Sequence, residues 1–318
     1  MGGGRMDFRQ LRYFLHVAEM QSLSRAAALL RVAQPALSRQ IKSLEEELGV
    51  PLLRRHGWGV TPTPAGQVLM NHARQVLKEV SAARDAVLAY QSEPSGTLSF
   101  GVPSSLSKVL LPGLAVRFRQ RAPKVRLHLV DGFSATIHEW LVQGHLDLAV
   151  LYETKTTDGL VSSPLLEEEM VLIGPAGRLA GQDSVSLAAV ADHDLILPAR
   201  PHRLRLLLDQ AFAEHGLSCE PVIEVDALSA LVELVRIGEA YTLLPHSSVH
   251  ELLLSGDLSA AAVAPPIRRS LVLARPQARV PTPASEALER EVVDFIRTQA
   301  ATLGWDVRHR IPDVEEIA

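Results

Sequence analysis

The stretch from Gln34 to Gly49, QPALSRQIKSLEEELG, decides how the rest of the chain is interpreted. Pro35 is tolerated in the first turn of a helix, and Gly49 is typical of a helix end. The apolar residues recur at steps of four, three and four and so form one core-facing stripe: Leu37, Ile41, Leu44 and Leu48. The opposite face carries hydrogen-bonding and cationic side chains: Gln34, Ser38, Arg39 and Lys42. A helix that reads DNA in the major groove needs this layout, and an ordinary amphipathic helix can also have it.

The segment before this stretch favours DNA reading. Residues 7–20 have the apolar spacing of a helix, and residues 25–30 predict an alanine-rich second helix that Ser24 can cap. Residues 31–33 then leave only a tight turn before the opening stretch. Two helices joined by such a turn predict a helix-turn-helix.

The segment after it predicts a wing and a long helix. Residues 50–62 hold prolines, glycines and alternating positions that are compatible with a β-hairpin. Arg54 and Arg55 would contact phosphates from this hairpin, unless it is a solvated loop. Residues 64–91 predict a helix with a heptad seam, which packs either on the chain's own body or, as its 3.5-residue period favours, on a second copy. The seam consists of Leu69, Ala73, Val76, Val80, Ala83 and Val87.

The predicted secondary structure changes from helices to alternating strands and helices after a hinge-like segment at residues 92–96. A first β-α-β-α-β half is predicted, with strands at 97–102, 125–130 and 147–152 and helices at 106–121 and 135–143. A second half has predicted strands at 170–173, 194–197, 222–225 and 241–244 and helices at 204–215 and 227–237. A last strand at 270–274 and helix at 284–303 would return to the first half. Two such lobes would enclose a ligand cleft.

Charge and composition agree with a two-part chain. The first 91 residues hold 12 Lys and Arg against 7 Asp and Glu, whereas the remainder holds 20 against 29. A basic first part suggests a polyanionic partner for that part alone. No apolar run is long enough to span a membrane and no secretory signal is evident, so we expect a cytoplasmic protein. The single Cys219 excludes an internal disulfide and is interpreted as a buried apolar residue.

At this point the chain resembles the LysR-type transcriptional regulators over nearly its whole length. The motifs that carry the resemblance are Leu11-Arg-Tyr-Phe14, Ser24-Arg-Ala-Ala27, Gln34-Pro-Ala-Leu-Ser38, Ile41-Lys-Ser-Leu-Glu45, Leu48-Gly49, Thr63-Pro-Ala-Gly66 and Gly144-His-Leu-Asp-Leu-Ala149, with the helix from Pro112 to Phe118. The resemblance implies an all-α winged helix-turn-helix plus an α/β periplasmic-binding-protein-like effector domain of two doubly wound lobes.

The expected division places the winged helix-turn-helix at 6–63, the dimerisation helix at 64–91, the hinge at 92–96, the effector domain at 97–303 and a tail at 304–318. Lobe I would comprise 97–166 and 265–303, and lobe II 167–264. The partners that the resemblance implies are promoter DNA, a small effector, further copies in a homodimer or homotetramer, and RNA polymerase. DNA contacts are expected from Ser24, Arg25, Gln34, Pro35, Ser38, Arg39, Lys42, Arg54 and Arg55.

Three departures from the family pattern bear on DNA binding. Ala33 stands where the family usually has a serine or threonine, so a capping hydroxyl is absent. Leu52-Leu-Arg-Arg55 replaces the usual Leu-Phe-x-Arg. Trp58 occupies the wing position where the family often has an arginine that enters the minor groove, so the wing lacks that cation.

The effector would lie beyond the carboxyl ends of the strands. Hydroxyls and free backbone N–H groups at helix starts there favour an anion such as a carboxylate, although each serine could also be a helix cap without a ligand. Arg200 and Arg203 could likewise belong to a solvated loop or a subunit contact. The candidate residues are Ser104, Ser105, Ser134, Thr136, Tyr152, Pro198, Arg200 and His202.

Other function classes are poorly supported. No nucleophile elbow, phosphate-binding loop or dinucleotide fingerprint is present, so no catalytic residue, cofactor or enzyme activity is expected. His246 and His250 are four residues apart, but no third metal ligand is evident, so no metal is expected. The alternatives to a regulator are a cytoplasmic small-ligand-binding protein without a promoter-specific role and an enzyme with an appended regulator.

Overall fold

The computed structural model of the chain describes residues 6–89, 94–153, 159–238, 240–305 and 307. Contacts divide the chain into two compact units. The first comprises residues 1–92 with a short segment at 143–145, and the second comprises the remainder. Within the described part of the chain, no helix is both long and apolar enough to cross a membrane.

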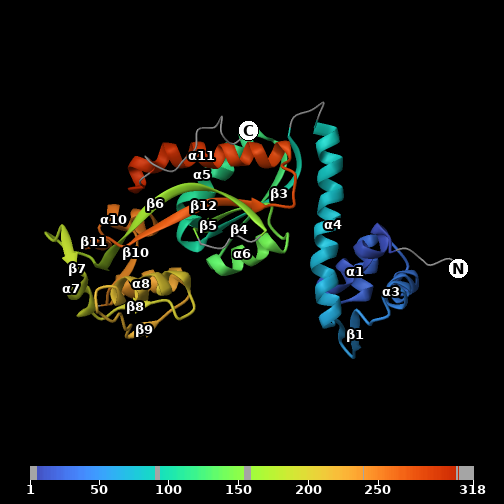
Figure 1. Cartoon of the computed structure of the whole chain (residues 1–318), viewed down its shortest axis with the longest axis horizontal. Helices are drawn as coiled ribbons and strands as arrows, with labels where there is room; N and C mark the ends of the chain where they lie inside the picture. Colours follow the sequence, from blue (N-terminus) through green and yellow to red (C-terminus); the bar gives the residue numbers. More distant parts are fainter. Residues whose placement is uncertain (1–5, 90–93, 154–158, 239, 306, 308–318) are drawn as a thin grey trace. The chain divides into compact units, whose positions relative to one another are not determined.

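The first unit is a three-helix cluster with a hairpin and a long helix (Figure 1). Its elements are α1 (Phe8–Met20), α2 (Leu23–Leu30), α3 (Gln34–Leu48), β1 (Leu53–His56), β2 (Gly59–Pro62) and α4 (Pro64–Ala89). The predicted stripe of α3 is buried at Leu37, Ile41 and Leu44, but its fourth member, Leu48, is 40% exposed because it lies in the last turn of the helix. Phe14 of α1 is also fully buried. The helix-turn-helix and the wing are therefore confirmed.

The helix starts differ in one detail from the prediction. Ser22, and not Ser24, is the N-cap of α2, and its Oγ accepts a hydrogen bond from the backbone N–H of Arg25 at 3.4 Å. Ser24 lies inside the helix because α2 begins two residues earlier than its alanines suggest. Ala33 caps α3 without any side-chain hydrogen bond, as predicted.

Two polar side chains attach the wing to the helices. One Glu45 oxygen on α3 accepts hydrogen bonds from the backbone N–H groups of Leu52 and Leu53, at 2.8 and 3.0 Å. The Thr63 hydroxyl donates to the carbonyl of Pro51 at 2.7 Å and accepts from the N–H of Gly66 at 3.0 Å. The hairpin is thus fixed at both ends.

Lobe I of the second unit is a parallel sheet between helices. Its elements are β3 (Ser95–Pro103), α5 (Ser104–Arg121), β4 (Lys124–Gly132), α6 (Ser134–Val142) and β5 (Leu148–Tyr152). The strand order is β4-β3-β5, all parallel. Helix α5 and the last helix, α11 (Pro283–Leu303), pack together over one face, and α6 covers the other (Figure 1). Of the expected hinge, residues 92 and 93 lie outside the described residues and Ser95 already begins β3.

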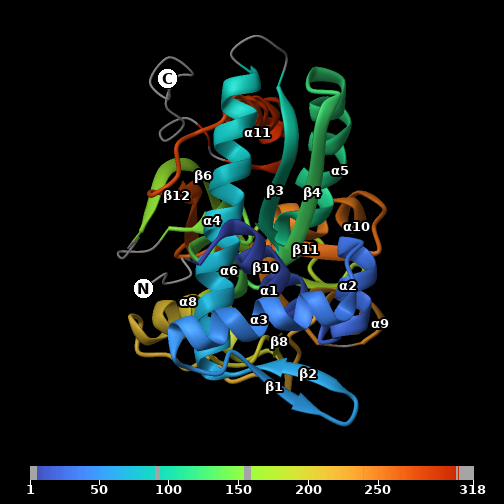
Figure 2. The same cartoon turned by 90° about the vertical axis from the view of Figure 1, so that its right-hand side faces the viewer.

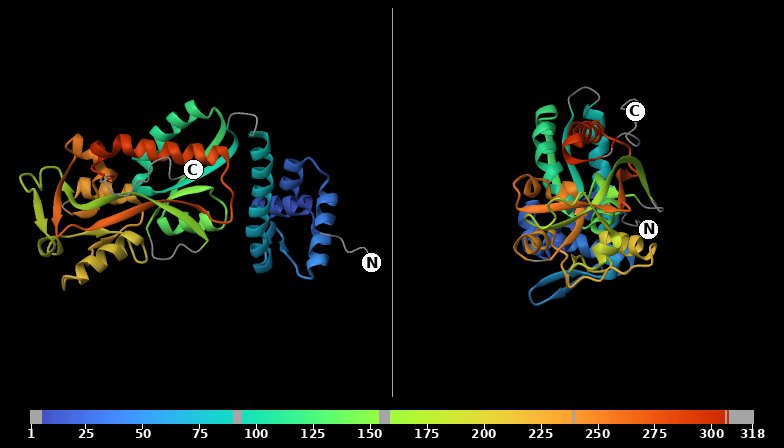
Figure 3. Two further views of the ribbon diagram at one scale, coloured as in Figure 1. Left: turned by 45° about the horizontal axis from the view of Figure 1, so that its top comes forward. Right: turned by 90° about the vertical axis from the view of Figure 1, so that its left-hand side faces the viewer.

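Two long strands cross from lobe I to lobe II (Figure 3). β6 (Leu160–Pro175) pairs antiparallel with β12 (Arg268–Pro276) in one lobe and with β10 (Thr242–Pro245) and β11 (Leu258–Ala264) in the other. The predicted strand at 170–173 is only the end of β6, because Glu167, Glu168 and Glu169 hid its continuation in the sequence. The two lobes therefore share one eight-stranded sheet.

Lobe II surrounds the far half of β6. It contains the short strands β7 (Ser184–Ser186), β8 (Ile196–Leu197) and β9 (Ile223–Glu224) and the helices α7 (Leu187–Ala191), α8 (Arg203–Ala213), α9 (Leu228–Ile237), η1 (His246–Val249) and α10 (His250–Leu254). The sequence analysis did not predict β7, α7, β11, η1 and α10. The predicted strands at 194–197 and 222–225 shorten to two residues each in β8 and β9.

Candidate DNA-binding surface and ligand cleft

The polar face of α3 is available to a partner. The side chains of Gln34, Pro35, Arg39 and Lys42 are exposed, and Ser38 is half-buried. The hairpin β1–β2 projects beside α3 as a wing (Figure 2). Ser24, Arg25, Arg54 and Arg55 are also exposed.

Hydrogen bonds position several of these side chains. The Ser24 hydroxyl donates to the side-chain oxygen of Gln34 at 3.2 Å. Arg25 donates to the carbonyl of Met20, so its guanidinium is held on its own unit. Lys42 Nζ lies 3.4 Å from Glu46 Oε1, but both side chains are highly exposed and such a pair contributes little. Arg39 and Arg54 have no ion pair among the described residues.

The wing ends in an unusual aromatic residue. Trp58 is 90% exposed. The centroid of its ring lies 4.8 Å from that of His56 in a tilted arrangement. The turn needs glycine at Gly59, where a Cβ would meet the carbonyl oxygen of Gln21 at 2.5 Å. The wing therefore has a fixed shape and carries arginines and a tryptophan.

The heptad seam of α4 is only partly covered within one chain. Ala73 is buried and Leu69 is half-buried, because this end of α4 packs on α1. Val76, Val80 and Val87 are 39%, 45% and 74% exposed, and Ala83 is also exposed. An aliphatic seam that continues beyond the helix cluster leaves apolar area for a partner.

The second unit encloses a small cavity between its lobes. It has a volume of ≈ 40 Å³. Six of the predicted effector residues line it: Ser104, Ser105, Ser134, Tyr152, Pro198 and His202. A wider space of ≈ 610 Å³ shares Ser104, Phe133 and Asp226 with the cavity, and the predicted Thr136 lies there. The cavity is therefore the inner end of a cleft that opens outward.

Helix geometry makes this cleft favourable for an anion. Helix α5 begins at Ser104 and α9 begins at Leu228, and both residues line the cavity. Neither N-cap, Pro103 or Ala227, supplies a side-chain hydrogen bond, so backbone N–H groups at both starts have no cap. Uncapped helix N-termini carry partial positive charge and bind anions.

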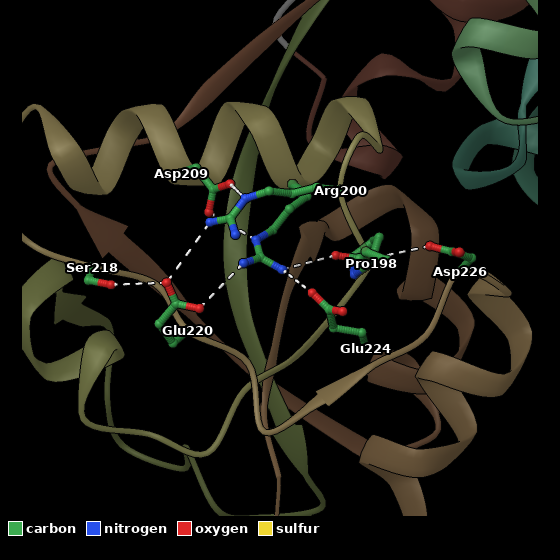
Figure 4. Close-up of polar contacts among 9 residues, drawn as sticks. Pro198, Arg200, Asp209, Ser218, Glu220, Glu224 and Asp226 are labelled. Carbon is green, nitrogen blue, oxygen red and sulfur yellow. Dashed lines mark hydrogen bonds and ion pairs between the residues drawn. The ribbon is translucent and has the colours of Figure 1, made fainter.

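Arg200 does not line the inner cavity. Its Nε donates to Asp209 at 2.7 Å, and Nη2 lies 4.0 Å from Glu220 (Figure 4). It borders a separate depression of ≈ 160 Å³ at the rim, with Ser134, Thr136 and His202. Its charge is therefore shared with carboxylates of lobe II.

His202 lines the cavity with an imidazole whose pKa is lowered, which favours its neutral form. Burial lowers its pKa, and the Coulombic effect of Arg269 acts in the same direction, whereas Asp226 opposes both. Its Nδ1 accepts a hydrogen bond from the N–H of Leu204 at 3.2 Å. The ring also meets that of Phe133 edge-on, with 5.1 Å between centroids.

Arg269, the one arginine or lysine among the described residues that line the inner cavity, was not predicted from the sequence. Arg269 lies on β12, with its side chain 2% exposed. It was missed because the predicted strand began at Ser270. Extending the apolar alternation of Leu271 and Leu273 back by one step would have placed Arg269 on the inner face.

No cluster of three or more metal-ligating side chains occurs among the described residues. The His246 and His250 rings lie 5.4 Å apart, and burial together with His250 lowers the pKa of His246. Cys219 is 3% exposed, and burial raises the pKa of its thiol to about 11.

The chain combines a winged helix-turn-helix unit with a two-lobed α/β unit that contains a ligand cleft. This combination is typical of a regulator that binds DNA and a ligand in the same chain. The chain belongs to the LysR family of bacterial transcriptional regulators. Residues 8–67 match the family described as bacterial regulatory helix-turn-helix protein, lysR family, and residues 91–298 match the LysR substrate binding domain.

Characterised relatives are regulators. The chain is 36% identical over 248 residues to the nitrogen assimilation regulatory protein nac of Klebsiella aerogenes, covering 78% of this chain and 81% of that protein. It is 36% identical over 259 residues to the HTH-type transcriptional regulator BbuR of Bordetella bronchiseptica, covering 81% and 80%.

Solved structures share the fold. A full-length variant of OxyR from Pseudomonas aeruginosa matches with a TM-score of 0.75 and 24% identity over 92% of this chain and 95% of that chain. Full-length CbnR complexed with its target DNA matches with a TM-score of 0.67 and 24% identity, covering 93% and 100%.

Proposed function

We propose that this chain is a cytoplasmic, non-enzymatic regulator that binds promoter DNA through α3 and the wing and a small anionic effector through the cleft. The observation that supports it most is the exposed polar face of α3 beside an arginine-bearing wing. Helices with such a face enter the major groove, and wings contact the flanking backbone.

We expect the first half of α3 to make the contacts to base edges. Gln34 and Arg39 can each make paired hydrogen bonds to base edges, and Ser24 orients Gln34. Pro35 and Ser38 would pack against the groove, while Arg25, Lys42, Arg54 and Arg55 would contact phosphates.

Dimerisation through α4 supplies the second reading helix. The exposed seam residues Val76, Val80, Ala83 and Val87, together with Leu69 and Ala73, would pair with the same residues of a second copy. Two such dimers would form a homotetramer on an inverted repeat. The DNA-bound homotetramer could then contact RNA polymerase.

The effector is inferred to be an anion because two uncapped helix N-termini and hydroxyls face the cleft. Ser104, Ser105, Ser134, Thr136, Tyr152, Pro198 and His202 would line it, and Arg200 would lie at the rim. A thiol-based redox signal is not supported, because the single cysteine, Cys219, cannot form a disulfide within one chain and is buried.

A gel-shift titration with the DNA upstream of the chain's own gene tests the DNA-binding proposal. We expect salt-sensitive binding that Arg39→Ala weakens more on this DNA than on random DNA, by about 1–3 kcal/mol. Arg290→Ala, an exposed site on α11, is the control. Equal loss on both DNAs would reduce Arg39 to a phosphate contact, and no binding to the upstream DNA would refute the proposal for that promoter.

A further inference from the structure

The inner wall of the cleft is built on a buried arginine and glutamate. Arg268 and Arg269 are adjacent on β12, but Arg268 is exposed and pairs with Glu169 at 2.8 Å, whereas Arg269 points inward. Arg269 Nε donates to Glu168 Oε1 at 2.6 Å, and Arg269 Nη2 also contacts that carboxylate. One edge of the guanidinium is therefore neutralised by an acid.

Glu168 is held from its other side as well. Its Oε2 accepts hydrogen bonds from the hydroxyl of Ser247 at 2.7 Å and from the indole N–H of Trp305 at 3.1 Å. Ser247 follows β10 in lobe II, and Trp305 follows α11 of lobe I. The carboxylate has donors on both oxygens, so it holds Arg269 in one orientation.

The Nη1 and Nη2 end of the guanidinium also donates to two neutral hydroxyls, although Nη2 contacts Glu168 as well. Arg269 Nη2 donates to the Ser105 hydroxyl oxygen at 3.0 Å, and Nη1 donates to the Tyr152 hydroxyl. Both hydroxyls line the cavity. Because each accepts from Arg269, each keeps its own proton for donation to a third group.

We propose that this end of Arg269, with the hydroxyls of Ser105 and Tyr152, is a receptor for the carboxylate group of the effector. Both hydroxyls accept from the guanidinium, so each can turn its own O–H toward one oxygen of a planar carboxylate while Arg269 supplies the positive charge behind them. The adjacent N-terminus of α5 adds positive potential. The inference rests on the proposed effector cleft and names the class of its ligand.

The volume limits what enters. A cavity of ≈ 40 Å³ holds about three or four waters, at roughly 10–15 Å³ each, so it accepts a head group of a few atoms. The remainder of the ligand would extend into the outer space of ≈ 610 Å³. The receptor therefore selects a compact carboxylate head on a body of variable size.

The test uses the full-length chain with Trp58→Phe and Trp140→Phe, so that Trp305 is the only tryptophan and its indole reports on Glu168. Acetate, pyruvate and benzoate are titrated as carboxylates, with acetamide as the neutral counterpart of acetate and phosphate as a tetrahedral anion. We expect saturable changes in Trp305 fluorescence with at least one carboxylate, and none with acetamide or phosphate. Equal binding of either control compound, or no binding of any carboxylate, would overturn the proposal.

Variants then identify the group that binds. Arg269→Met should lower the association constant about tenfold or more, and Arg269→Lys should restore only part of it because an ammonium lacks the planar fork that holds Glu168 and both hydroxyls at once. Ser105→Ala provides a milder change should Arg269→Met fail to fold. Arg268→Met, on the outer face of the same strand, should bind as the parent does.

Unchanged binding in Arg269→Lys and Ser105→Ala would also overturn the proposal. DNA binding in the gel shift is measured on the parent with unaltered cleft residues. If the parent does not bind DNA, the DNA-binding part of the proposed function is contradicted, whereas a parent that binds DNA but no carboxylate contradicts the receptor alone.

Discussion

Arg55 on the wing donates a hydrogen bond from Nη2 to the hydroxyl oxygen of Ser38 on the reading helix α3, at 2.9 Å. The bond joins residues that are 17 apart in the chain and sets the wing against the polar face. We expect Arg55→Ala to weaken binding to promoter and random DNA alike and to reduce the slope of log K against log salt by about one. Gel shifts over a range of salt concentrations measure both.

Ser38→Ala separates the two partners of that bond. It leaves the charge of Arg55 in place, so the salt slope should stay unchanged while discrimination between promoter and random DNA falls. A lower slope in Ser38→Ala would show that the serine, by holding Arg55, is required for the phosphate contact.

The Thr63 hydroxyl should stabilise the start of α4. Thr63→Val removes both its hydrogen bonds, to Pro51 and from Gly66, and should cost about 1–2 kcal/mol locally. Hydrogen exchange of the first-turn amides of α4 should then be about tenfold faster. Thr61→Val on β2 is the control, and equal exchange in both variants would contradict the capping role.

The exposed half of the α4 seam gives a prediction about assembly. Val80→Glu would place a charge at a position that is 45% exposed in one chain and buried in the proposed dimer. We expect a lower mass by light scattering and loss of binding to an inverted repeat. Val68→Glu, exposed on α4 outside the seam, should change neither, and an unchanged mass for Val80→Glu would refute this seam as the interface.

Local periodicity was sufficient for the elements that bury one regular face. The stripe Leu37, Ile41 and Leu44 predicted α3 within one residue of its observed ends. The first half of the α/β unit was equally predictable from the sequence. β5 is an apolar run, β3 and β4 place an apolar residue at every second position, and the segments between them have helical spacing. The cleft residues Ser104 and Ser134 followed from their place after such strands.

What the sequence could not show depends on contacts between distant segments. Glu168 and Arg269 look like solvated charges in the sequence, and their burial depends on each other across 101 positions. Arg200 looked like a cleft cation, but the structure engages it with Asp209 of α8. Charge pairing of this kind has no local periodicity, so periodicity cannot reveal it.

Asp209 accepts hydrogen bonds from Arg200 Nε at 2.7 Å and from Nε of the fully buried Arg205 on α8 at 2.9 Å, and this cluster predicts a pH dependence for lobe II. Burial alone would raise the pKa of Asp209, but hydrogen bonds from Arg200 and Arg205 hold it below its ordinary value. Its stabilising contribution is therefore fully present above pH ~4 and is lost as pH falls through the lower folded pKa. Acid unfolding of Asp209→Asn should show a shallower pH dependence below pH ~4, with lower stability at pH 7.

The buried thiol gives a test that needs no DNA or effector. Burial disfavours the thiolate and raises the pKa of Cys219 to about 11, so the folded chain should react slowly with a disulfide reagent at pH 7 to 9 and faster as pH approaches that value. The chain unfolded in guanidinium should react at once, because its thiol has an ordinary pKa of ~8.5. Ser218→Cys with Cys219→Ala moves the thiol one position to an exposed site and should react fast when folded. Fast reaction of the folded parent would mean that Cys219 is accessible, and a thiol-based redox signal would then have to be reconsidered.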